Sequence, residues 1–165
     1  MKQDRFLLVL LGVILALIVL ALALFFTRQQ SLDYIADDSP RGVVHNYVIA
    51  LLKKDYEKAY SYLYEDPKKP SLETFKTAFV SRQLDPSAVS VEIGDMQEGE
   101  RQVTINLLIL HSGTDPFSSG YNEQASATLV LTKEGEWKLS SMPYPFWSWD
   151  WYNPPIEPIP APGSD

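Results

Sequence analysis

The N-terminal region contains the feature that most restricts what this chain can form. From Phe6 to Phe26 every residue is apolar or glycine, 21 positions without interruption. An α-helix rises about 1.5 Å per residue, so a helix of this length extends about 31 Å, close to the thickness of the hydrocarbon core of a bilayer. The run therefore predicts a transmembrane anchor over residues 1–26, with the lipid bilayer contacting residues 6–26.

A cleavable signal peptide is the alternative interpretation of the same region. Lys2 and Arg5 supply a positively charged start, and residues 21–23 (Ala-Leu-Ala) have the small-x-small form that signal peptidases accept. The apolar part of a signal peptide usually covers roughly 7–15 residues, however, and this run continues to Phe26. Its length favours a retained anchor, and cleavage remains open.

Charge on either side of the run predicts the orientation. Lys2 and Arg5 precede it, whereas Arg28 is followed by acidic residues. Because Lys and Arg remain on the cytoplasmic side, we expect a single-pass cell-membrane protein with a cytoplasmic N-terminus and an extracytoplasmic C-terminal domain.

Composition excludes several classes of partner and site. Residues 27–165 carry 12 Lys and Arg against 20 Asp and Glu, and the whole chain has no cysteine. An acidic surface without clustered cations disfavours nucleic acid as a partner, and the absence of cysteine excludes disulfides, thiolate metal sites and cysteine nucleophiles. The sequence indicates no cofactor and no metal site.

The remaining chain predicts one α+β domain. Residues 27–38 are expected to form a juxtamembrane linker, and residues 39–142 the domain. Ser39, Asp55 and Ser71 are each suited to cap a helix, and apolar residues then recur at helical spacing. From Val89 onward apolar residues alternate in four segments separated by turns, which is typical of antiparallel strands. Residues 154–165 are proline-rich, and we expect them to be disordered.

Residues 39–51 and 55–63, together with residues 136–139 (Glu-Trp-Lys-Leu), resemble the opening helices and final strand of nuclear transport factor 2-like domains. This resemblance implies a cone-shaped roll in which three helices pack on a curved four-stranded antiparallel sheet. The superfamily contains isomerases, dehydratases and cyclases as well as non-catalytic modules, so the fold does not choose the function. No catalytic residue can be carried over to this sequence.

Four residues are candidates for lining a ligand pocket in such a cone: Tyr47, Tyr60, His111 and Trp137. His111 ends an apolar strand, where a histidine can act as a general base. A histidine at the surface end of a strand is the more common case, however. Tyrosine hydroxyls can orient a ligand, although tyrosines at helical spacing also fit ordinary core packing.

Residues 143–153 form the least ordinary segment, with Trp147, Trp149, Trp151 and Tyr152 close together. If the segment is extended, the three tryptophans point to one side. One interpretation is that they close the open end of the sheet and are buried. The other is that they contact the membrane or form an exposed platform for a partner protein or glycan.

The function predicted from these features is a non-catalytic binding or assembly module of the cell envelope, membrane-anchored, with a protein partner or a second copy. The alternative is an enzyme of the isomerase or dehydratase type that binds a small apolar molecule in the cone.

Overall fold

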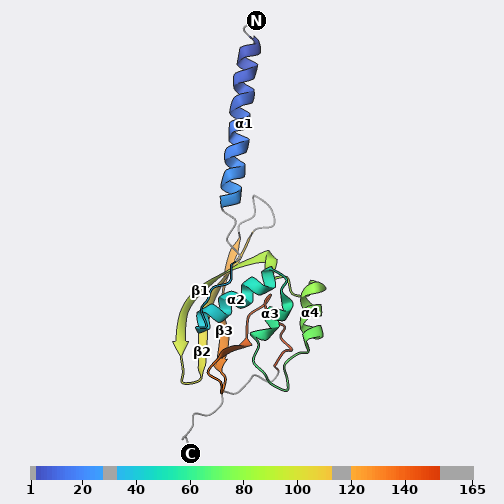
Figure 1. Cartoon of the computed structure of the whole chain (residues 1–165), viewed down its shortest axis with the longest axis vertical. Coiled ribbons are helices and arrows are strands. Elements are labelled where there is room, and N and C mark those ends of the chain that lie inside the picture. The colour runs from blue at the N-terminus through green and yellow to red at the C-terminus, as the bar shows by residue number, and fades with distance from the viewer. Residues whose placement is uncertain (1–2, 28–32, 113–119, 153–165) are drawn as a thin grey trace, which may run out of the picture. The chain divides into compact units, whose positions relative to one another are not determined.

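The computed structural model describes residues 3–27, 33–112 and 120–152. The chain divides into two compact units, residues 1–32 and residues 33–165. The first unit contains α1 (Gln3–Thr27), shown in blue in Figure 1. Those of its side chains that the structure describes are exposed to solvent.

The prediction of a membrane-spanning helix is contradicted. Crossing a bilayer requires a helix of about 20 predominantly apolar residues, and a search of the described residues finds no helix that meets the requirements of length and apolarity. The predicted fold, in which a transmembrane helix precedes the roll, is therefore corrected. The single-pass topology and the cell-membrane location, which were inferred from that helix, are corrected with it.

The second unit contains three α-helices that begin at the capping residues predicted from the sequence. In each case the cap side chain accepts a hydrogen bond from the backbone amide three residues further on. This bond satisfies one of the amides that lack a partner in the first turn of a helix. The helices and their caps are α2 (Pro40–Leu52, Ser39), α3 (Tyr56–Ser61, Asp55) and α4 (Leu72–Val80, Ser71).

Four strands form one antiparallel sheet in the order β1-β2-β3-β4, which makes β2 an interior strand. A short 3-10 helix, η1 (Pro86–Ala88), precedes the sheet. The register of β1 against β2 shifts between Ile93 and Met96. Irregularities of this kind bend a strand, and Figure 1 shows β1 curving around α2. The strands are β1 (Val89–Glu98), β2 (Gln102–His111), β3 (Tyr121–Leu131) and β4 (Trp137–Ser141).

The core lies between the helices and one face of the sheet. Side chains alternate along a strand, and on β2 every second residue from Val103 to Ile109 is almost fully buried. α2 lies across this face (Figure 1) and contributes Val44, Tyr47 and Leu51 to the same cluster. An α+β arrangement with four antiparallel strands is thus supported.

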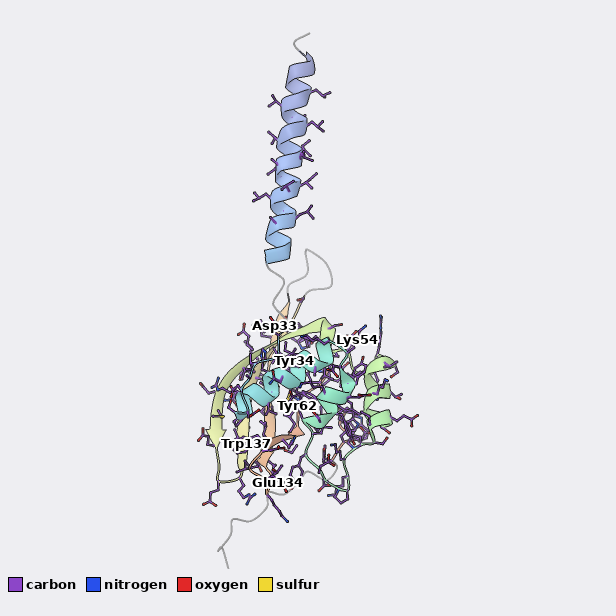
Figure 2. The ribbon with its side chains drawn as sticks, in the orientation of Figure 1. Asp33, Tyr34, Lys54, Tyr62, Glu134 and Trp137 are labelled. Atoms are coloured by element: carbon purple, nitrogen blue, oxygen red, sulfur yellow. The ribbon has the colours of Figure 1, made fainter. Side chains whose placement is uncertain are left out.

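The end of the predicted linker contacts the domain. Asn46 of α2 accepts a hydrogen bond from the Ile35 amide and donates one to the Ile35 carbonyl, both at 2.9 Å. The ring of Tyr34, labelled in Figure 2, lies 4.6 Å from the ammonium of Lys53 and 5.0 Å from that of Lys58. These contacts attach residues 34 and 35 to the folded unit, although sequence analysis assigned them to a linker.

Candidate functional site

The aromatic-rich segment near the C-terminus folds as consecutive turns. The Phe146 amide donates a hydrogen bond to the Pro143 carbonyl at 2.9 Å, and the Trp151 amide donates one to the Ser148 carbonyl at 3.2 Å. An extended strand would place alternate residues on the same side, and turns do not. The three tryptophans were expected to point to one side only if this segment were extended, and the segment is not extended.

Three of the four aromatic candidates in this segment are buried. Trp147, Trp151 and Tyr152 are 6%, 7% and 2% exposed. The centroid of the Trp151 ring lies 5.2 Å from that of Phe75 on α4 and 5.3 Å from that of Trp147. Ring contacts at these distances stabilise a core beyond the area they bury. These three residues complete the hydrophobic core, as the first interpretation of the segment proposed.

Trp149 is the exception, because 85% of its surface is exposed. Its two neighbours in the sequence are joined by a hydrogen bond, which the Ser148 hydroxyl donates to the Asp150 carboxylate. The buried rings on both sides hold the backbone of this turn. The indole is consequently presented to solvent from a constrained loop.

A surface hollow of about 340 Å³ lies between this loop and α4. Glu73, Thr77 and Gln83 line it from the helical side, and Ser148 and Asp150, the sequence neighbours of Trp149, line it from the loop. Two of its lining residues are carboxylates and none is a lysine or arginine. The hollow is therefore suited to a cationic or hydrogen-bond-donating side chain.

The four residues predicted to line a ligand pocket do not converge. The Tyr47 hydroxyl donates to the Phe146 carbonyl at 2.7 Å, and the Tyr60 hydroxyl donates to the Pro70 carbonyl at 2.8 Å. Trp137 is half-buried against the core. Among the surface hollows of the described residues, four have volumes of about 340–600 Å³, and none of these four is lined by Tyr47, Tyr60, His111 or Trp137.

His111 has a carboxylate neighbour that sequence analysis missed. Its Nε2 atom lies 3.4 Å from a carboxylate oxygen of Glu123, and its ring stacks on Tyr121 with centroids 4.2 Å apart. The pairing of β2 with β3 brings these residues together, because His111 lies opposite Tyr121 in the register. Part of the sequence between these two strands lies outside the described ranges, and spacing alone did not indicate this pair.

Two buried tyrosines are expected to make the protein less stable at alkaline pH. Burial raises the pKa of Tyr47 and of Tyr152, whose hydroxyls donate to backbone carbonyls. In the unfolded chain both ionise near pH 10. The stability they provide is complete below that pH and is lost as the pH rises above it, by about 1.4 kcal/mol per pH unit for each tyrosine. Denaturant titrations between pH 9 and 12 should show stability falling as the pH rises, and Tyr47→Phe should make this fall less steep.

Within the described residues, no group of three or more His, Cys, Asp or Glu side chains is arranged to hold a metal ion.

Comparisons with known proteins show the following similarities. No protein-family model and no curated protein sequence matches the chain. Among solved structures, it is similar to RPA3114, a SEC-C motif-containing protein from Rhodopseudomonas palustris, with 11% identity over 70% of this chain and 82% of that one and a TM-score of 0.45. It is also similar to RV0760c from Mycobacterium tuberculosis, with 12% identity over 66% of this chain and 93% of that one and a TM-score of 0.39. The cell shape determining protein Pgp2 from Campylobacter jejuni matches with 12% identity over 59% of this chain and 37% of that one, and with a TM-score of 0.40. These similarities establish no family for the chain, and the resemblance to nuclear transport factor 2-like domains stays a prediction.

Proposed function

We propose that residues 33–152 form a non-catalytic protein-binding or assembly module that contacts its partner through Trp149. The observation that carries this proposal is the 85% exposure of one indole in a segment whose other tryptophans are buried. Tryptophan is among the residues most enriched at the energetic centres of protein interfaces. Leaving this ring in water keeps a large apolar surface hydrated, and a partner would remove that cost.

The constrained loop strengthens the proposal. Binding usually loses part of its energy in ordering the side chains and loops of the interface. Here Trp147 and Trp151 are anchored in the core on both sides of Trp149, so little backbone freedom remains to be lost. A preformed loop of this kind increases affinity, because the entropy cost of ordering it is met when the protein folds and not when the partner binds.

The hollow beside the loop indicates the chemistry of the partner. Glu73 and Asp150 give it negative charge, and the whole chain carries a net charge of −7. A partner surface with a Lys or Arg next to an apolar patch matches both features, since the cation enters the hollow while the patch covers Trp149.

The enzyme alternative receives less support from the same geometry. An active site of that type needs an enclosed cavity in which polar groups converge. The hydroxyls of Tyr47 and Tyr60 are instead directed to backbone carbonyls, and a core filled with side chains occupies the space between α2 and the sheet.

Native mass spectrometry of the full-length protein, isolated gently from its own cells, tests the proposal. We expect a stoichiometric protein partner or a second copy of the chain. Trp149→Ala should weaken that complex by about 30-fold or more, because removing a central tryptophan costs at least ~2 kcal/mol. Tyr121→Ala provides the matched control, since this aromatic ring is also mainly exposed (63%) but lies on β3, and it should leave the complex intact.

Two outcomes would contradict the module. A complex that survives Trp149→Ala unchanged would remove Trp149 from the interface. A monomer without any protein partner, whether or not it carries a small molecule, would contradict the module.

A further inference from the structure

A second hollow, of about 440 Å³, opens where α2 and α4 end. Leu52, Tyr56 and Val80, which are partly or mainly exposed, form an apolar wall, and Lys54, Arg82 and Asp85 lie around it. Lys54 is at the edge of the domain between α2 and α4 (Figure 2). The hollow thus combines an apolar surface with charged groups, as ligand sites commonly do.

The backbone of the two cationic residues is unusual. Lys54 and Arg82 adopt φ angles of +60° and +59°, the left-handed region that favours glycine. Each follows a helix end, and Lys54 closes α2 with amide bonds from Lys54 to Leu51 and from Asp55 to Ala50. Glycine is the usual residue at such positions. Two of the three non-glycine residues with positive φ in the described part of the chain thus line this one hollow.

The charges around the hollow do not cancel. Asp85 accepts hydrogen bonds from the hydroxyl and the amide of Ser87. These bonds, the first of them most strongly, and the nearby Arg82 and Lys54 charges lower the pKa of the Asp85 carboxyl. Asp85 is therefore ionised at neutral pH, and one carboxylate faces two cations. The site keeps one net positive charge on a chain whose net charge is −7.

We infer that this hollow binds a free small organic anion, with its apolar body against Leu52, Tyr56 and Val80 and its anionic group between Lys54 and Arg82. A purely apolar ligand would remove water from two cations without replacing it, whereas an anion pairs with them. The volume is within the range of pockets for small molecules, roughly 300–1,000 Å³. This inference does not depend on the role of Trp149.

Anilinonaphthalenesulfonate is a suitable probe, because it joins one permanent negative charge to an aromatic body. The full-length protein is labelled at its methyl groups, and the probe is titrated while NMR signals of Leu51, Leu52, Val80 and Leu84 are followed. We expect these signals to shift with saturation. Phenylnaphthylamine, which has the same body without the charge, should bind at least threefold more weakly at these methyl groups.

Charge variants then change the affinity in opposite directions. Lys54→Gln combined with Arg82→Gln should weaken probe binding by roughly tenfold, and Asp85→Asn should tighten it by roughly threefold. One exposed charge pair contributes about 0.7 kcal/mol, which corresponds to threefold, and the double variant loses two such pairs. A gain of affinity in Asp85→Asn is not explained by loss of folding. Lys76→Gln combined with Lys133→Gln removes the same charge from exposed positions on α4 and the β3–β4 turn and should leave affinity unchanged.

Glycine variants separate the ligand role from the helix-end role. Lys54→Gly and Arg82→Gly keep the left-handed backbone available, so the melting temperature should not fall, while probe affinity falls as in the glutamine variants. Absence of shifts at the four methyl-bearing residues, or binding equal for the charged and neutral probes, would overturn the inference. A lower melting temperature together with unchanged affinity would show that both cations serve the helix ends alone.

Discussion

Replacing Trp151 with alanine is expected to lower the free energy of unfolding by about 3–5 kcal/mol, the range measured when large aromatic side chains are removed from protein cores. The ring packs against Phe75, Phe79 and Trp147 with centroid distances of 5.2–6.2 Å. Removing the ring leaves a cavity where α4 contacts the aromatic-rich segment. Denaturant unfolding followed by circular dichroism measures the difference.

Trp149→Ala is the matched control for that experiment, since it deletes the same side chain two positions away. Trp149 is 85% exposed and contributes little buried surface, so its replacement should change stability by no more than about 0.5 kcal/mol. Similar losses in both variants would contradict the division of this segment into buried rings and one exposed indole.

Gly42→Ala is expected to destabilise the domain by about 1–3 kcal/mol although alanine is the better helix former. A Cβ atom at this position would lie 2.1 Å from the backbone oxygen of Asp37 and 2.7 Å from its carbonyl carbon. The backbone at Asp37 must move, and with it the Asp37 carboxylate that accepts hydrogen bonds from the amide and hydroxyl of Ser39. Thermal or denaturant unfolding of the full-length variant provides the measurement.

Gly12→Ala is the control, because a Cβ atom there meets nothing within 4 Å. It should leave the unfolding of the second unit unchanged. If Gly42→Ala were also neutral, the close approach of residue 37 to α2 would not be needed for the stability of the domain.

Sequence analysis succeeded where a structure depends on neighbours in the chain. Ser39, Asp55 and Ser71 were recognised as caps because a cap bonds an amide only three residues away. The strands were recognised because one buried face imposes alternation on residues such as Ile105 and Ile109. The helix caps and the strand alternation can each be recognised within a stretch of about ten residues.

The interpretation of residues 1–26 did not succeed. Twenty-one consecutive apolar residues (Phe6–Phe26) predicted a membrane span, and the described residues contain no helix that qualifies as one. The prediction was based on the length of the apolar run. The cell-membrane location and the single-pass topology depended on the same run, so all three conclusions are corrected together.

The candidate site was only partly predictable. Sequence singled out the aromatic segment, but it did not distinguish Trp149 from Trp147 and Trp151. Turns in the segment, and rings on α4 available to receive the indoles, decide which of them is buried. Likewise Glu123 lies near His111 through strand register, and Lys54 lies near Arg82 because α2 and α4 end at the same hollow.

The sequence by itself determined the helix starts, the alternating strands and the acidic, cysteine-free composition, because each follows from residue chemistry and short-range spacing. The tertiary structure alone decided which aromatic ring stays in water and which charged groups share a hollow. Those properties depend on contacts between residues far apart in the chain, and local periodicity contains no information about which distant side chain fills a given space.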